Sequence, residues 1–277
     1  MSVQMANTGE ILEHLIRSPP QSQHAIAYNY LVPNIKGLEN LVKIMDAEGA
    51  TAETQGTPSK PATRTEISFF TAATEAFCKA NTNCTIAESL ERARPIVELA
   101  KSRNIRVRGY VSVALGCPYE GPDVPPSKVA EITASLLEMG VDEVSVADTT
   151  GMGTAPRTLE LLRTLKAAGI ANTDIALHFH DTYGQALVNT IVGLEHGIRI
   201  FDSSVGGLGG CPYSKGATGN VATEDLVHTL HSLGMHTGIN LEEMSKIGAW
   251  ISNELGRANE SRAGKATLAR LEGSCAL

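Results

Sequence analysis

Two histidines in the second half of the chain have the spacing of a metal site. His178 and His180 stand two residues apart in the segment Leu177-His-Phe-His-Asp-Thr182, which has the apolar character of a β-strand. Because side chains alternate between the two faces of a strand, both imidazoles should point to the same side. Paired imidazoles bind divalent metals, with carboxylate, amide or water oxygens as the other ligands. Histidines that simply pack show the same pattern, but the adjacent Asp181 carboxylate favours a metal site.

A glycine-rich loop after the next predicted strand carries a second reactive group, Cys211. The loop reads Asp202-Ser-Ser-Val-Gly-Gly-Leu-Gly-Gly-Cys-Pro-Tyr-Ser-Lys-Gly-Ala-Thr-Gly-Asn220. Glycine at this density indicates a loop that moves or that a ligand approaches closely. A partly exposed thiol near a metal can act as a nucleophile or as an acid and base. A near copy, Gly116-Cys-Pro-Tyr-Glu-Gly121, follows an earlier strand, so spacing alone does not choose between Cys117 and Cys211.

Oxygen-bearing side chains near these motifs each have two interpretations. Asn220 is a neutral oxygen ligand of the kind that Mg²⁺ accepts, or the residue that caps a predicted helix over 222–233. Glu224 and Asp225 either complement the N-terminus of that helix or orient the metal ligands from behind. Asp148 ends another predicted strand, where it is either the partner of a ligand or a structural cap.

These residues lie at the ends of strands in a repeating β-α pattern. The predicted strands are Ala25–Val32, Glu66–Ala72, Arg106–Ala114, Glu143–Asp148, Asp174–Asp181 and Ile198–Val205. The predicted helices between them are Ile35–Met45, Ile86–Ser102, Pro126–Met139, Arg157–Gly169 and Tyr183–His196. Several strands are continuous apolar runs, as expected for a parallel sheet that helices cover. Because polar residues end several different strands, the pattern favours a (β/α)8 TIM-type barrel over a doubly wound sheet, whose site lies at one switch point.

The number of units falls short of a full barrel. We count six β-α units where a closed barrel has eight, so we expect a single, incomplete barrel-type catalytic domain over residues 1–277, truncated at its N-terminus. Residues 46–65 are rich in Ala, Thr, Gly and Pro, lack apolar periodicity and exceed the usual length of an αβ loop. We predict that this segment is a disordered insert.

Composition and charge argue against several classes of partner. The formal net charge of −7 disfavours nucleic acid and anionic membranes, since phosphate groups call for basic surfaces. No apolar run approaches the roughly 20 residues that a transmembrane helix needs. The five cysteines lack the spacing of a zinc site or a disulfide framework, which fits a reducing compartment.

Four segments of the chain closely resemble a known family. They are RVRGYVSVALGCPYEG (106–121), VADTTGMGT (146–154), HFHDTYGQALVNT (178–190) and DSSVGGLGGCPYSKGATGN (202–220). They resemble the hydroxymethylglutaryl-CoA (HMG-CoA) lyases, metal-dependent barrel enzymes, and the resemblance runs from about Gln4 to the C-terminus outside the insert. It implies a (β/α)8 barrel that binds Mg²⁺ or Mn²⁺ and cleaves the acyl-CoA substrate 3-hydroxy-3-methylglutaryl-CoA to acetoacetate and acetyl-CoA, in leucine catabolism and ketogenesis. It also implies a homodimer in the mitochondrial matrix, with a cytoplasmic or peroxisomal location left open.

The resemblance assigns a role to each candidate residue. His178, His180 and Asn220 match the metal ligands, and His178 also takes part in proton transfer. Cys211 matches the loop cysteine that protonates the departing acetyl carbanion. The other matching residues line the substrate pocket (Arg108, Ser145 and Asp148) or support the site (Asp181, Glu224 and Asp225).

One motif of the family is absent from the sequence. Family members carry an Arg-Asp-Gly motif whose arginine stabilises the enolate and whose aspartate is a metal ligand, and no Arg-Asp pair occurs in this chain. Loss of such a preorganised charge typically costs at least ~10²-fold in rate. We therefore consider two alternatives to the function of an HMG-CoA lyase. The chain is either a non-catalytic relative, or another carbon–carbon lyase or acyl-CoA Claisen enzyme of the same barrel group.

Overall fold

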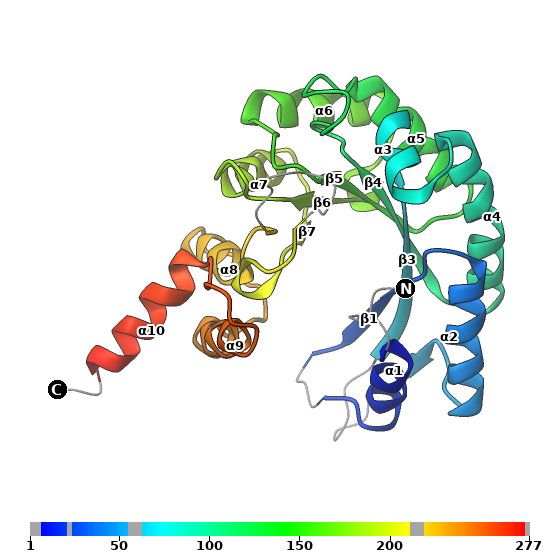
Figure 1. Cartoon of the computed structure of the whole chain (residues 1–277). Helices are drawn as coiled ribbons and strands as arrows, with labels where there is room; N and C mark the ends of the chain where they lie inside the picture. The colour runs from blue at the N-terminus through cyan, green and yellow to red at the C-terminus, as the bar shows by residue number, and fades with distance from the viewer. Residues whose placement is uncertain (1–6, 21–23, 55–62, 211–218, 275–277) are drawn as a thin grey trace.

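The fold is a curved parallel sheet covered by helices on its outer side (Figure 1). The computed structural model describes residues 7–20, 24–54, 63–210 and 219–274. Six parallel strands lie in the order β1-β3-β4-β5-β6-β7, and the two-residue β2 pairs antiparallel with the start of β3. Their bounds are β1 Ile26–Leu31, β2 Glu53–Thr54, β3 Thr63–Ala72, β4 Arg106–Ser112, β5 Glu143–Asp148, β6 Ile175–Phe179 and β7 Ile200–Asp202.

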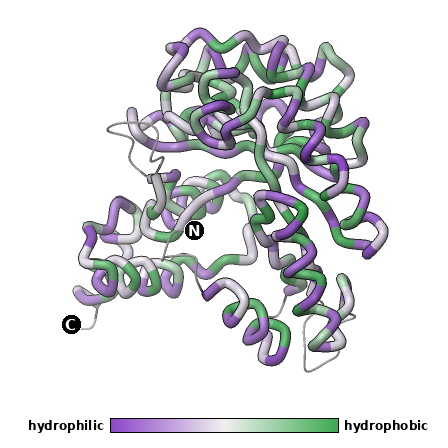
Figure 2. Tube along the Cα trace, turned by 45° about the vertical axis from the view of Figure 1, so that its right-hand side comes forward, coloured by the Kyte–Doolittle hydropathy of each residue, from purple (hydrophilic) through white to green (hydrophobic). Residues whose placement is uncertain are grey.

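Helices connect successive strands and continue beyond the last one. Those that precede or connect strands are α1 Thr8–Arg17, α2 Ile35–Ala47, α3 Glu75–Thr82, α4 Ile86–Ser102, α5 Pro126–Glu138, α6 Ala155–Ala167 and α7 Ala186–Glu195. Three more follow β7, namely α8 Thr223–Ser232, α9 Leu241–Glu254 and α10 Arg262–Ser274, and short 3-10 turns span η2 Asn172–Asp174 and η3 Val205–Gly207. In Figure 2 the helices alternate between hydrophilic and hydrophobic residues, as amphipathic helices that cover a sheet do.

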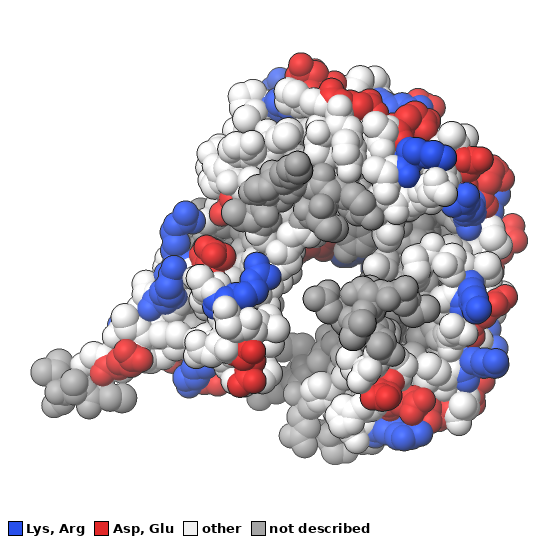
Figure 3. Space-filling view, in the orientation of Figure 1, with Lys and Arg blue, Asp and Glu red and all other residues white. Residues whose placement is uncertain are grey.

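The sheet curls but does not close. Within the described residues, β1 pairs only with β3 and β7 pairs only with β6, so these two strands form the edges. The space-filling view shows an opening between the arm of α8 to α10 and the side that carries α1 and α2 (Figure 3). The prediction of an incomplete barrel with six parallel strands is therefore confirmed.

Strand β4 shows how the sequence separates the two faces of the sheet. Val107 and Val111 are fully buried against the covering helices, whereas Arg106, Arg108 and Tyr110 alternate with them and are only partly buried. Gly109 lies on the helix side, where an added Cβ would come within 3.1 Å of a methyl group of Leu136 on α5. The glycine thus allows α5 to pack closely, and the concave face receives charged groups instead of the apolar layers usual in barrels.

The predicted strands and helices agree with the structure to within a few residues at most ends, and one prediction is wrong in part. Residues 46–65 do not form a single unstructured insert, because residues 46–47 end α2 and the Glu53–Thr54 strand pairs with Thr63 and Arg64. A two-residue strand has too few positions to show periodicity, so this backbone pairing had no signal in the sequence. Residues 55–62, the middle of the segment, lie outside the described residues. None of the described helices is long and apolar enough to cross a membrane.

Candidate active site

The two histidines lie side by side at the carboxyl ends of the strands. His178 is the penultimate residue of β6 and His180 follows the strand, with their ring centroids 5.3 Å apart. The backbone of His180 forms an antiparallel bridge with Asn220, where the chain returns from the glycine-rich loop. Side chains of directly bridged residues are close neighbours. The structure therefore brings together the three predicted metal ligands from segments some forty residues apart.

The side-chain amide of Asn220 presents an oxygen atom that a cation could bind. Its Nδ2 donates to the carbonyl of Leu208 at 3.0 Å, but its Oδ1 is buried without a hydrogen-bond partner among the residues that the structure describes. Buried acceptors without partners are rare and costly. The described residues hold no cluster of three or more His, Cys, Asp or Glu suited to a metal. A divalent cation would fit two imidazoles and this amide oxygen, with water or substrate oxygens as the remaining ligands.

Asp202, at the end of β7, contacts His178 and was not singled out from the sequence. Its Oδ2 lies 3.2 Å from His178 Nδ1 and accepts a hydrogen bond from Ser145 Oγ at 2.9 Å, while Oδ1 accepts one from Arg108 at 2.7 Å. Burial by itself would raise the pKa of Asp202, but the hydrogen bonds and the Arg108 charge overcome it and lower this pKa to about 2. Asp202 is thus an anion at neutral pH, held against the imidazole.

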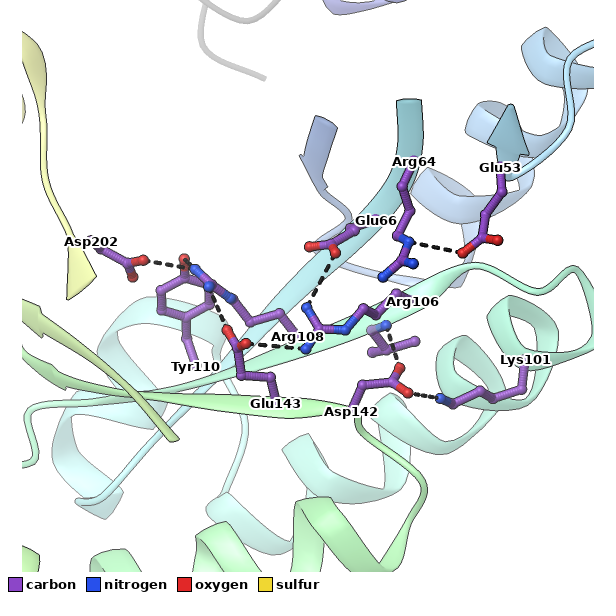
Figure 4. A network of polar contacts seen from close by, with 11 residues as sticks. Glu53, Arg64, Glu66, Lys101, Arg106, Arg108, Tyr110, Asp142, Glu143 and Asp202 are labelled. Atoms are coloured by element: carbon purple, nitrogen blue, oxygen red, sulfur yellow. Dashed lines mark hydrogen bonds and ion pairs between the residues drawn. The ribbon is translucent and has the colours of Figure 1, made fainter. Parts of the chain in front are cut away.

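A chain of alternating charges crosses the concave face from β3 to β7 (Figure 4). Arg108 contacts Glu143 as well as Asp202, and its Nη1 donates to Tyr110 Oη at 3.3 Å. Arg106 bridges Glu143 at 3.1 Å and Glu66 at 3.2 Å. The three carboxylates outnumber the two guanidinium groups by one. This excess negative charge attracts a cation toward the face that carries the histidines.

The structure gives Arg108 and Ser145 protein partners rather than an open pocket wall. Ionic partners and Tyr110 raise the pKa of Arg108 further despite its burial, and its Nε is buried with no hydrogen-bond partner in the described ranges. Both side chains donate to Asp202, so their predicted contact with substrate stays a prediction. The charge chain had a signal in the sequence: the alternation of Arg106, Arg108 and Tyr110 on one strand places all three on the same face.

Asp148 closes the turn after β5. Its Oδ2 accepts a hydrogen bond from the backbone N–H of Gly153 at 2.9 Å, and Thr150 Oγ1 lies 3.4 Å from Oδ1. Burial raises the pKa of this carboxyl to about 6, although backbone hydrogen bonds oppose the rise. Of the two roles considered for Asp148, the contacts support the structural cap.

We predict that Asp148→Asn makes stability less dependent on pH. Because folding raises the pKa of Asp148 from 3.8 to about 6, the folded state favours the protonated form, and its stability falls as the pH rises through this window. The amide of the Asp148→Asn variant does not titrate in this pH range. Between about pH 4 and pH 7, its free energy of unfolding should gain up to about 3 kcal/mol relative to the wild type. Urea unfolding at both pH values measures this, with Asp123→Asn at an exposed position as the control; equal pH slopes would contradict it.

The predicted supporting residues brace the elements around the loop. Both oxygens of buried Glu224 accept from the backbone N–H of Gly206, at 2.9 and 3.1 Å, and burial raises the pKa of Glu224. Asp225 accepts from Ser261 Oγ at 2.7 Å and from the N–H of Ala263 at 2.6 Å, which fixes the start of α10. Asp181 accepts from the N–H of Ala186 at 3.0 Å, at the start of α7.

Comparison with known proteins decides the family. The HMGL-like family matches residues 25–251, most of the chain. This chain belongs to the HMGL-like family. A mitochondrial hydroxymethylglutaryl-CoA lyase from Macaca fascicularis is 44% identical over 95% of this chain and 74% of its own length. A 3-hydroxy-3-isohexenylglutaryl-CoA/hydroxymethylglutaryl-CoA lyase from Pseudomonas aeruginosa is also 44% identical, over 96% of this chain and 81% of its own.

Solved structures of HMGL-like proteins share the fold. The hydroxymethylglutaryl-CoA lyase from Pseudomonas aeruginosa superposes with a TM-score of 0.83 at 43% identity and covers 96% of this chain and 81% of that chain. An HMG-CoA lyase from Acinetobacter baumannii in complex with coenzyme A and 3-methylmalate gives a TM-score of 0.79 at 29% identity, covering 94% of this chain and 77% of that chain. The incomplete barrel is therefore built on the HMG-CoA lyase fold.

The two Gly-Cys-Pro-Tyr loops of this HMGL-like chain can be compared only in part, because Cys211 lies outside the described residues. Cys117 is buried, and its Sγ accepts a hydrogen bond from Thr74 Oγ1 at 3.1 Å. Its backbone pairs with Gly121 in both directions, so the turn is tightly closed. A buried thiol held by its neighbours is usually inert. These contacts indicate a structural role for Cys117.

Proposed function

We propose that this chain is a divalent-metal-dependent carbon–carbon lyase that cleaves 3-hydroxy-3-methylglutaryl-CoA to acetoacetate and acetyl-CoA. The observation that carries the proposal is the buried Oδ1 of Asn220, which has no hydrogen-bond partner within the described part of the chain, beside paired histidines in an HMGL-like chain. His178, His180 and Asn220 would hold Mg²⁺ or Mn²⁺. When bound, the cation polarises the tertiary hydroxyl of the substrate.

The proposed reaction also needs proton transfers, for which we consider Cys211 and His178. In the reaction the tertiary hydroxyl passes its proton to a water molecule, the carbon–carbon bond breaks with its electron pair passing to the thioester enolate, and that enolate takes up a proton. We assign this last protonation to Cys211, as the resemblance implies. His178 has one nitrogen occupied by Asp202, and the other cannot hold a cation and a proton at once. We therefore assign His178 to the metal rather than to proton transfer.

The relatives support an acyl-CoA ligand and a cellular location for the proposed enzyme. A relative's structure holds coenzyme A and 3-methylmalate, which supports an acyl-CoA substrate here. We propose a homodimer that serves leucine catabolism and ketogenesis in the mitochondrial matrix. The mitochondrial relatives support that location, while an equally similar relative comes from Pseudomonas aeruginosa.

Acetoacetate release by the full chain with added Mg²⁺ tests the proposed reaction. Because the sequence has no Arg-Asp pair, we expect metal-dependent release at a rate at least about 10²-fold below that of the Pseudomonas relative. Absence of release above a metal-free blank would contradict the lyase. The missing pair favours a second candidate, a relative that binds the acyl-CoA without cleaving it, and equilibrium binding without turnover would establish that candidate.

We predict that Cys211→Ser and Cys117→Ser have different kinetic effects. A general acid contributes about 10²-fold or more, so Cys211→Ser should lower kcat by that factor with a smaller change in KM. Cys117→Ser should leave kcat nearly unchanged, since the Cys117 thiol is buried against Thr74. Steady-state acetoacetate assays on both variants measure this. The assignment is wrong if Cys117→Ser lowers kcat more while its circular dichroism matches the wild type.

A further inference from the structure

The neighbours of His178 determine which of its two ring nitrogens carries the proton. Nδ1 lies 3.2 Å from Asp202 Oδ2, and the two residues are directly paired across β6 and β7. The Asp202 carboxylate accepts hydrogen bonds from Arg108 and Ser145, and a carboxylate paired with a guanidinium group has no proton to donate to the imidazole. An imidazole that faces such an acceptor donates Nδ1–H and leaves Nε2 with a free lone pair.

Asp202 is itself held in place from two sides. Arg108 donates to Oδ1 at 2.7 Å and Ser145 donates to Oδ2 at 2.9 Å. The Arg108 guanidinium is fixed in turn by Glu143, whose side chain is 1% exposed. The carboxylate therefore has little freedom to rotate away from the imidazole. This accounts for two conspicuous inward-facing side chains, Arg108 and Ser145, by contacts within the protein.

We infer that Asp202 is a positioning residue that fixes His178 as the Nδ1–H tautomer, with Arg108 and Ser145 as its braces, so that Nε2 is available to a divalent cation. The inference rests on the proposed function only for the identity of what Nε2 binds. Carboxylates that orient metal-binding histidines in this way raise metal affinity by ~10–100-fold. Asp202 touches neither substrate nor metal in this arrangement and acts through His178.

The substitution Asp202→Asn reverses the polarity of this contact with almost no change in shape. Arg108 is a donor, so it keeps the amide oxygen at the position of Oδ1. The amide nitrogen must then occupy the position of Oδ2, facing His178 Nδ1, where it donates. His178 is driven to the Nε2–H tautomer, whose Nε2 cannot bind a cation. Ser145→Ala is the matched control, because it removes another contact to the same oxygen and leaves the one to His178.

Two-bond ¹H–¹⁵N correlation spectra of the metal-free full chain, in mildly alkaline buffer, read the tautomer directly. The chain has eight histidines, and loss of one signal set in His178→Gln assigns His178. We expect Nδ1–H in the wild type and in Ser145→Ala, and Nε2–H in Asp202→Asn. An Nε2–H wild type would overturn the inference without any need for a variant, and so would an Asp202→Asn protein that keeps Nδ1–H.

Metal binding supplies a second measurement. The dissociation constant of Mn²⁺, followed by the electron paramagnetic resonance of the free ion, should rise ~10–100-fold in Asp202→Asn and far less in Ser145→Ala. An equal rise in both variants would overturn the inference, because it would reflect general loosening of the site. A wild type that binds no Mn²⁺ would instead contradict the proposed metal site, while the metal-free spectra still decide the tautomer.

Discussion

Replacement of Glu143 by glutamine should lower the free energy of unfolding by about 3–5 kcal/mol, the usual cost of breaking a buried ion pair from one side. Glu143 has a side chain only 1% exposed and contacts both Arg106 and Arg108. Glutamine keeps the shape but removes the charge, and it turns an amide N–H₂ toward one of the two guanidinium groups. Arg108 then keeps a single ionic partner inside the sheet. Urea unfolding followed by circular dichroism measures the loss.

The same substitution on the surface provides the control. Glu131 on α5 pairs with Lys128 at 3.1 Å, and its side chain is 67% exposed. Glu131→Gln should change the free energy of unfolding by less than about 1 kcal/mol, since solvent screens such pairs. Equal losses of unfolding free energy in the two variants would contradict the prediction, because the buried ion pairs of Glu143 would then stabilise the fold no more than a surface pair.

The substitution His180→Ala should weaken the binding of Mn²⁺ at least about 100-fold. Loss of a residue that only orients a metal ligand already costs ~10–100-fold, and loss of a ligand itself should cost no less. His180 is buried, neighbours His178 and is bridged to Asn220. The variant therefore loses a ligand and the group that aligns the returning strand. Isothermal titration calorimetry with Mn²⁺ measures the affinity, and metal-dependent acetoacetate release should disappear with it.

A histidine outside the site gives the comparison. His228 lies exposed on α8, so His228→Ala removes an imidazole without touching the candidate ligands. Its Mn²⁺ affinity should equal that of the wild type. Unchanged Mn²⁺ affinity in His180→Ala would remove His180 from the ligand set, whatever the effect on activity.

Features with local signals were predictable from the sequence. The repeating β-α pattern predicted the strands, and the spacing of His178 and His180 predicted a shared face because it depends only on alternation along one strand. The helix predicted over 86–102 begins with such a local signal, since Thr85 and Glu88 form a capping box at the start of α4. Helix α9 had a comparable signal, since Asn240 caps it through the N–H groups of Glu242 and Glu243, but no helix was predicted there.

Features that depend on register were not predictable. Arg108 faces Glu143 and His178 faces Asp202 only because neighbouring strands pair with a particular offset. Those partners are 35 and 24 residues apart in the chain, and no local periodicity relates them. The sequence therefore identified which residues could bind a metal, but the carboxylate that orients His178 emerged only from the packed sheet.

The charge chain also affects how the sheet would unfold in part. Its carboxylates lie on β3, β5 and β7 and both of its arginines lie on β4, so each of these strands taken alone would carry unpaired charges on its inner face. If β6 and β7 frayed, Arg108 would lose Asp202 and keep only Glu143. Partial unfolding that separates these strands is thus unfavourable beyond the loss of backbone hydrogen bonds. The charge chain links β3, β4, β5 and β7 by ion pairs, so we expect these strands to separate cooperatively rather than one at a time.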